Sequence, residues 1–223
     1  GIKMAKGRKL IFLDDDSIID NNYFLNCKNN LKTDSILYCG KINYNIENLS
    51  NYQKFKYLVH KEYNFKKYLE AKNIVTMNMI ADRKFIIKNG LYFNESFKGY
   101  GLEDYEFGYR VIKKGFKIKL INANIIHNEQ NKTFKNFLHK VYILSKNAMP
   151  ILIDQNYEAA KKINFYKFEN NYLIKKFIKF KFTNLLLKVL IQILIFFEDK
   201  IYLKNLYYFG IYLSYLKGAF NRK

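Results

Sequence analysis

The fold of this chain is decided by the stretch KLIFLDDD, residues 9–16. Residues 10–13 form a continuous apolar run, which is typical of a strand covered on both faces in a mostly parallel sheet. Asp14, Asp15 and Asp16 would then follow the carboxyl end of that strand. Open α/β sheets bind their ligands at this end, because the loops diverge there and leave a crevice. The stretch therefore predicts an α/β fold with a ligand site at the three aspartates.

The three adjacent carboxylates also suggest what binds there. Neighbouring carboxylates repel one another, and a divalent cation is the simplest group that neutralises them. Oxygen ligands suit Mg²⁺ or Mn²⁺, and an imidazole such as that of His127 favours Mn²⁺. Taken alone, an acidic triplet is more often a solvated turn or a helix cap, and a lone histidine is more often an ordinary core or surface residue. The combination of the three aspartates with His127 predicts a divalent metal site.

A second acidic cluster occurs in the stretch GYGLED, residues 99–104. Glu103 and Asp104 open a helix predicted over 103–114, where helix capping and the helix dipole favour acids in any case. The two glycines permit the backbone conformations of a ligand-facing loop, and Tyr100 offers a flat face on which a sugar ring can pack. This stretch predicts a second part of the same site.

The remaining signals over the first 130 residues alternate between strands and helices. Strands are predicted over 35–42, 74–80 and 116–126, and a helix or a loop over 51–69. Asp82 is predicted to cap a helix over 83–88 that ends at Asn89-Gly90, and residues 91–101 are predicted to be a loop. Residues 1–7 are typical of the end of a helix that Gly7 stops.

The amino-acid composition limits which classes of partner the protein is expected to bind. The 223 residues are 49% hydrophobic, which supports one sizeable core and excludes disorder throughout. A formal net charge of +20 favours anionic partners, although abundant Lys, Asn, Ile, Tyr and Phe are also typical of a coding bias. No nucleic-acid-binding motif occurs, so nucleic acid is not expected. Cys27 and Cys39 match neither a metal knuckle nor a redox pair, which predicts two reduced thiols in a cytoplasmic protein.

The chain changes character near residue 134. We expect one domain over 1–133 and a mostly helical, basic and aromatic extension over 134–223. Its apolar stretches, 185–197 and 201–216, are shorter or more interrupted than the roughly 20 apolar residues of a membrane-spanning helix. Flanking lysines favour helices that lie on an anionic membrane surface at the inner face, whereas a helical pair packed on the main domain explains the amphipathic pattern equally well.

The two acidic stretches together resemble family 2 glycosyltransferases. Residues 1–16, GIKMAKGRKLIFLDDD, are similar to the helix, strand and Asp-x-Asp motif at the centre of that family. Residues 78–110 resemble the acceptor half that the family shares with the galactosyltransferase C-terminal domain, including chondroitin-polymerase-like enzymes. This segment contains NMIADR, the Asn89-Gly90 turn and GYGLEDYEFGYR. The resemblance covers about residues 1–130.

The resemblance implies a partial GT-A (Rossmann-like) domain and an inverting transfer from a nucleotide sugar, expected to be a UDP-sugar, to a glycan or lipid-linked sugar. It implies Asp104 as the catalytic base. Asp14 and Asp15 would contact the donor, and Asp14, Asp16 and His127 would ligate Mn²⁺ or Mg²⁺. The acceptor would be bound by four residues of the second half: Asn78, Tyr100, Gly101 and Glu103.

Three alternatives differ from this interpretation. In the family, strands that bind the nucleotide base precede the segment that residues 1–16 resemble. The sequence therefore resembles an enzyme without its N-terminal nucleotide-binding half. A non-catalytic remnant that folds or attaches to a membrane without turnover is therefore the main alternative. A haloacid-dehalogenase-type phosphatase also has an apolar strand before Asp-x-Asp, but Ile18 stands where a small hydroxyl residue or valine is expected. Nucleic-acid binding has only the basic and aromatic composition in its favour.

Overall fold

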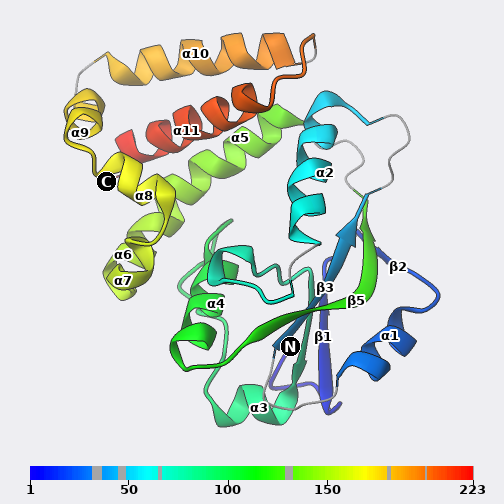
Figure 1. The fold of residues 1–223 in the computed structure, drawn as a ribbon. Coiled ribbons are helices and arrows are strands. Elements are labelled where there is room, and N and C mark those ends of the chain that lie inside the picture. Colours follow the sequence, from blue (N-terminus) through cyan, green and yellow to red (C-terminus); the bar gives the residue numbers. More distant parts are fainter. Residues whose placement is uncertain are drawn as a thin grey trace. The chain divides into compact units, whose positions relative to one another are not determined.

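The computed structural model describes residues 1–31, 37–44, 49–64, 67–128, 133–179, 182–198 and 200–222. The chain divides into two compact units, each considered by itself (Figure 1). Unit 1 comprises Gly1–Leu49, Lys56–Asn94 and Asp104–Gln130, and unit 2 comprises Ser50–Phe55, Glu95–Glu103 and Asn131–Lys223. The chain is mixed α/β with a helical C-terminal part, as predicted. The predicted domain boundary at residue 133 stays a prediction.

Unit 1 is built on a five-stranded sheet with the order β1-β4-β3-β5-β2. Of its four pairings, β3 with β5 is parallel, and β1 with β4, β4 with β3 and β5 with β2 are antiparallel. The prediction of a mostly parallel sheet is therefore wrong. The strands are β1 (Lys9–Leu13), β2 (Ser17–Ile19), β3 (Leu37–Asn43), β4 (Asn78–Asp82) and β5 (Ile118–His127).

Strand β1 lies at an edge of this sheet and is only partly buried, contrary to the prediction that it is covered on both faces. Leu10 is buried, but Leu13 is 40% exposed. An apolar run does not reveal how many neighbours a strand has. The direction of β1 nevertheless agrees with the prediction. Because β4 is antiparallel to both β1 and β3, the strands β1, β3 and β5 run the same way. The carboxyl ends of these three strands therefore lie at the same end of the sheet, so Asp14 follows β1 at the end where Tyr44 and His127 lie.

The helices of unit 1 follow local sequence signals. The Asp82 side chain accepts a hydrogen bond from the Phe85 N–H and caps α3 (Arg83–Lys88), and Gly90 adopts a φ of 60° just beyond it. Both observations confirm the predicted helix. The helix predicted over 103–114 is α4 (Glu103–Lys113). The other helical segments are α1 (Tyr23–Asn30), α2 (Asn51–Tyr63, shared with unit 2) and the short 3₁₀ helix Ala71–Asn73.

The alternation of Phe116, Ile118 and Leu120 with Lys117 and Lys119 predicts a half-exposed strand. The burial of β5 agrees with this, because Ile118 and Leu120 are buried whereas Lys117 is exposed and Lys119 is half-buried. The helix α1 packs against β5, and the strand lies between β3 and β2. Cys27 on α1 and Cys39 on β3 are buried free thiols, as predicted, and burial raises the pKa of Cys39 to about 12.

The N-terminal segment differs from its prediction. Instead of the end of a helix, residues 2–4 form a turn in which the Ala5 N–H donates to the Gly1 carbonyl oxygen at 3.0 Å. The strand predicted over 35–42 is described from Leu37 onward, and residues 35 and 36 lie outside the described residues. The strand predicted over 74–80 begins later, at Asn78.

Unit 2 is helical. Helix α11 (Lys204–Phe220) packs against α5 (Phe134–Ile143) and α10 (Thr183–Glu198) (Figure 1). A Cβ at Gly210 would lie 2.8 Å from Cζ of Phe134, so glycine permits the close approach of α11 and α5. The unit also contains the π-helix Leu144–Ala148, α6 (Met149–Gln155), α7 (Tyr157–Ala160), α8 (Asn164–Glu169) and α9 (Tyr172–Lys179). In the described part of the chain, no helix is long and apolar enough to cross a membrane.

Candidate functional site

The sheet of unit 1 brings Asp16 and His127 together. His127 is the last residue of β5 and pairs with Ser17, the first residue of β2, so Asp16 lies beside the imidazole. Nε2 of His127 is 3.3 Å from Oδ2 of Asp16, and the Asn128 N–H donates to the Asp16 carbonyl oxygen at 2.9 Å. His127 is 4% exposed. Two predicted site residues from distant parts of the chain are thus in direct contact.

A row of polar side chains continues behind His127. The Tyr44 hydroxyl lies 3.3 Å from Nδ1 of His127 and 2.5 Å from Nδ1 of His60 on α2. The Tyr44 ring stacks on His60, with ring centroids 5.3 Å apart. Neither Tyr44 nor His60 was predicted from the sequence. The parallel register that pairs Asn43 with Ile126 brings Tyr44 beside His127, because these are the next residues along the two strands.

The hydrogen bonds of this row determine one another. An ionised Asp16 accepts from Nε2–H of His127, so a neutral His127 accepts at Nδ1 from the Tyr44 hydroxyl. The Tyr44 oxygen can then accept from Nδ1–H of His60. Desolvation, with repulsion from Lys56 and His127, lowers the pKa of His60 to about 3. His60 is therefore neutral at pH 7, and its Nδ1 either donates to or accepts from the Tyr44 hydroxyl, depending on the tautomer.

Asp14 and Asp15 lie in the turn between β1 and β2. Both are exposed, and the Asp14 carbonyl oxygen accepts from the Ser17 N–H at 3.1 Å. Over the described residues, no group of three or more His, Cys, Asp or Glu side chains is arranged to hold a metal ion. The structure joins Asp16 with His127, and the ligation by Asp14 stays a prediction, as does donor contact by Asp14 and Asp15.

The pair Asp16 and His127 suits neighbouring positions around one divalent cation. Ligands about 2.1 Å from a cation and at right angles to each other are about 3 Å apart. The Nε2–Oδ2 separation of 3.3 Å is close to that value. One carboxylate and one imidazole form a donor set that Mn²⁺ accepts, with the other positions left for substrate oxygens or water. These two residues therefore fit the cation that the sequence predicted.

Asp104, the predicted base, lies in the first turn of α4 and is half-buried. Its Oδ1 accepts from the Thr76 hydroxyl at 2.6 Å, and its Oδ2 accepts from the Thr76 N–H at 3.2 Å. Thr76 thus fixes the orientation of the carboxylate. Each carboxylate oxygen has more than one lone pair, so Asp104 retains capacity to accept a further proton or hydrogen bond. Its catalytic role stays a prediction.

The loop before α4 belongs to unit 2 and has unusual backbone geometry. Gly101 has a φ of 102° and Leu102 a φ of 70°, a left-handed conformation that costs a leucine roughly 1–2 kcal/mol. A Cβ on Gly101 would lie 2.6 Å from Cδ1 of Leu144. Tyr100 is 44% exposed, and Nζ of Lys140 lies 4.9 Å from its ring centroid. Strain of this kind is often found at functional loops.

Glu103 has a buried carboxylate oxygen, Oε2, with no hydrogen-bond partner among the described residues. Buried polar atoms are normally bonded, so an orphaned acceptor is a feature that a ligand hydroxyl could satisfy. The role of Glu103 in binding an acceptor sugar stays a prediction.

Much of the motif EDYEFGYR that follows serves the fold of unit 1. Nε of Arg110 donates to Oε1 of Glu106 at 2.7 Å, and Nη2 of Arg110 donates to the Tyr92 carbonyl oxygen at 2.6 Å. Phe107 is fully buried, and a Cβ on Gly108 would lie 2.7 Å from Cγ2 of Ile74. These contacts hold α4 against the preceding loop and so position Asp104.

Asn78, predicted to contact the acceptor, is fully buried in the sheet. Its Nδ2 donates to the carbonyl oxygens of Lys41 and Ala123 at 3.1 and 2.9 Å, and its Oδ1 accepts from the Tyr23 hydroxyl at 2.7 Å. The side chain thereby bridges the register shift between β3 and β5 at Gly40 and Lys41. The geometry indicates a structural role, and direct contact with an acceptor stays a prediction.

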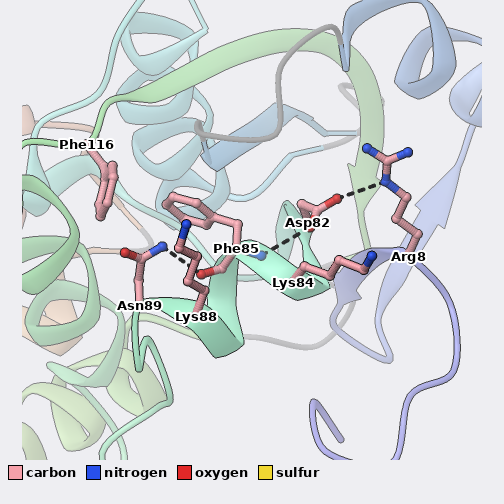
Figure 2. A pocket seen from close by; sticks show the side chains of 7 residues that line it. All are labelled: Arg8, Asp82, Lys84, Phe85, Lys88, Asn89 and Phe116. Carbon is pink, nitrogen blue, oxygen red and sulfur yellow. Dashed lines mark hydrogen bonds and ion pairs between the residues drawn. The ribbon is translucent and has the colours of Figure 1, made fainter.

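A cavity of about 620 Å³ lies at the other end of β1, away from the acidic turn. Arg8, Lys84 and Lys88 give it a basic lining (Figure 2). Nε of Arg8 and Nζ of Lys9 each lie 3.3 Å from Oδ2 of Asp82. Burial opposes ionisation of Asp82, but the Phe85 N–H and these two cations outweigh it and lower the pKa of Asp82 below its ordinary value. The remaining lining residues are Phe85, Asn89 and Phe116.

Comparison with known proteins agrees with the sequence analysis at a coarse level. Residues 56–139 match the family model of the N-terminal domain of galactosyltransferase. The match supports a glycosyltransferase-type domain and sugar transfer in general. It spans less than half of the chain, includes Asp104 and His127, and does not extend to the aspartates at 14–16. The comparison with curated proteins gave no match.

Proposed function

We propose that this chain is an inverting, metal-dependent glycosyltransferase that moves a hexosyl group from a nucleotide sugar to a glycan or lipid-linked sugar. The observation that carries the proposal is the contact of Asp16 with His127, which lies within the segment that matches a galactosyltransferase domain. The match supports sugar transfer, and the contact supplies a donor pair that suits a divalent cation. A UDP-sugar is the donor that we favour.

On the donor side, Asp16 and His127 would hold Mn²⁺ or Mg²⁺, and Asp14 and Asp15 would face the donor. A bound cation stabilises the negative charge that develops on the departing nucleoside diphosphate. Tyr44 would act as a positioning residue, because a metal-bound histidine is oriented by the partner of its other ring nitrogen. If Nε2 of His127 held the cation, its Nδ1–H would donate to the Tyr44 oxygen, and the Tyr44 hydroxyl would donate to Nδ1 of the neutral His60.

On the acceptor side, Asp104 would be the catalytic base. It would take the proton from the acceptor hydroxyl while that oxygen forms a bond to C1 of the donor sugar. The bond between C1 and the diphosphate oxygen breaks in the same displacement, so the configuration at C1 inverts. An aspartate is a weak base, with an ordinary pKa of about 3.9, and must act through position. Glu103, Gly101 and Tyr100 would bind the acceptor sugar.

The proposal is tested by release of UDP from a panel of UDP-sugars in the presence of Mn²⁺, with and without oligosaccharide acceptors. We expect UDP release that EDTA abolishes and that Asp16→Asn and His127→Gln reduce by at least about 100-fold. Asp154→Asn and His139→Gln make the same chemical changes at exposed positions of unit 2 and should leave the rate unchanged.

The variant Asp104→Asn separates the proposed role of the catalytic base from metal-dependent binding of the donor. It should lose acceptor-dependent transfer while retaining Mn²⁺-dependent binding of UDP, because the amide has no basic oxygen but is nearly the same size. If neither binding nor UDP release is detected with any UDP-sugar, the chain does not act on these donors, and the non-catalytic alternative is favoured.

A further inference from the structure

Helix α10 has a broad apolar face that the described residues leave exposed. The exposed fractions of six large apolar side chains on this helix range from 43% for Phe197 to 62% for Leu185. At 100° per residue these positions fall within an arc of about 120°, so they form one continuous face. The exposed apolar face consists of Leu185, Leu186, Val189, Ile193, Phe196 and Phe197.

The opposite side of α10 makes the contacts that hold the helix in unit 2. Leu187 and Ile191 are buried, and the helix packs against α11. Glu198 is also buried, and its Oε1 accepts from the Tyr207 hydroxyl at 2.9 Å. Only part of the apolar surface of α10 is therefore buried within unit 2. Exposure of six large apolar residues on one helix is costly in water and marks a binding surface.

Charge around this face indicates the partner. Residues 170–197 contain five lysines and no aspartate or glutamate. Lys175 and Lys176 are exposed on α9, where Tyr172 and Leu173 are also exposed, at 76% and 70%. Nζ of Lys200 lies 3.9 Å from the ring centroid of Phe196. Lysines beside an apolar and aromatic face are the composition of helices that lie in the headgroup region of anionic bilayers.

We infer that the exposed face of α10, with the lysines of α9, docks this protein on the surface of an anionic lipid bilayer. The apolar side chains enter the boundary between headgroups and acyl chains, and the lysines contact lipid phosphates. A second copy of the chain fits the face less well, because each copy would bring the same lysines to the interface. The inference is independent of the proposed sugar transfer.

Flotation with lipid vesicles tests the apolar contribution. The full chain should float with vesicles of phosphatidylcholine and phosphatidylglycerol at low salt. The double variant Leu185→Ser with Phe196→Ser should weaken this binding by about tenfold or more, because two partly inserted side chains are lost. The matched control is Phe24→Ser with Leu25→Ser, which removes a phenylalanine and a leucine that are 62% and 56% exposed on α1. This control should bind like the parent chain.

A tryptophan reporter tests the orientation of α10. The chain contains no tryptophan, so Phe196→Trp introduces a single fluorophore. Its emission should shift to the blue with anionic vesicles and should be quenched by lipids brominated on their acyl chains, since interfacial helices insert about 5–10 Å. The emission of Phe24→Trp should not change. Pure phosphatidylcholine vesicles and high salt should both reduce the shift.

Three results would overturn the inference. The first is absence of flotation with anionic vesicles at low salt. The second is equal vesicle binding by the α10 double variant and its parent. The third is a dimer in sedimentation velocity without lipid that Leu185→Ser with Phe196→Ser converts to a monomer, which would assign the face to a second copy. Circular dichroism of each variant verifies that the helices are retained.

Discussion

The imidazole of His127 lies 3.3 Å from the carboxylate of Asp16, although 111 positions separate the two residues in the chain. The pairing of β2 with β5 produces this contact, and the parallel pairing of β3 with β5 adds Tyr44 on the other side of the imidazole. The site therefore depends on sheet topology more than on any local motif. A change that leaves the sheet intact but removes one member of the row should affect ligand binding more than folding.

Tyr44→Phe tests the positioning role of Tyr44. We expect the affinity for UDP with Mn²⁺ to fall by about 10-fold or more, because His127 loses the partner of its second ring nitrogen. The free energy of unfolding should fall by only about 1 kcal/mol. The control Tyr63→Phe removes another buried hydroxyl, which donates to the Gly40 carbonyl oxygen at 3.3 Å, and should leave affinity unchanged. Equal affinities of the two variants in calorimetry would contradict the role.

Asn78→Ala distinguishes a structural role from contact with substrate. The change removes three hydrogen bonds, including the Asn78 acceptor of the buried Tyr23 hydroxyl, so the free energy of unfolding should fall by about 2–4 kcal/mol. Urea unfolding followed by circular dichroism measures this. Asn124→Ala loses a single bond, from its Nδ2 to Oδ2 of Asp20 at 3.2 Å, and should cost less than about 1 kcal/mol. A stable Asn78→Ala variant with weaker acceptor binding would instead support the sequence prediction.

Asp82 should contribute to stability at neutral pH. Its pKa in the folded chain is below the ordinary value of 3.8, so its contribution is present above pH 3.8 and is lost as the pH falls through the folded-state pKa. Asp82→Asn keeps the helix cap but removes the charge. At pH 7 we expect this variant to unfold about 1–2 kcal/mol more easily, since Arg8 is mainly exposed and adds little. Urea titrations should show that the difference shrinks below pH 3.8, and a constant difference would disprove the assignment.

Gly101→Ala should destabilise unit 2 strongly. The new Cβ meets the Leu144 side chain at 2.6 Å and is also disfavoured at a φ of 102°, so we expect a loss of at least about 2 kcal/mol. The control Gly90→Ala has a φ of 60° and no atom within 4 Å of the new Cβ, so only the backbone penalty of about 1 kcal/mol applies. Similar unfolding midpoints for the two variants would show that the loop yields to the added methyl.

Local sequence signals correctly predicted helices whose ends depend on neighbouring residues. Asp82 and Gly90 marked both ends of α3, and the helix after the GYGL stretch begins at Glu103 as expected. The partners of the strands could not be predicted in this way. The apolar run of β1 looks the same at an edge as in the interior, and the mostly parallel sheet was predicted from that run alone.

The candidate site could be predicted only in part, because it also depends on which strands are neighbours. Asp16 and His127 carried chemical signals in the sequence, and the structure joins them. Tyr44 is one of 20 tyrosines, and His60 lies in a segment with no recognised motif, so neither carried a signal of its own. A prediction that β3 and β5 are parallel neighbours would have placed Tyr44 beside His127.

Calorimetric titration of UDP into the chain with Mn²⁺ tests the central claim most directly. We predict binding that requires Mn²⁺, is lost or at least about 100-fold weaker in Asp16→Asn and His127→Gln, and is unchanged in Asp154→Asn and His139→Gln. Binding that persists without Mn²⁺, or that is equal in all four variants, would show that Asp16 and His127 do not form a metal-dependent nucleotide site.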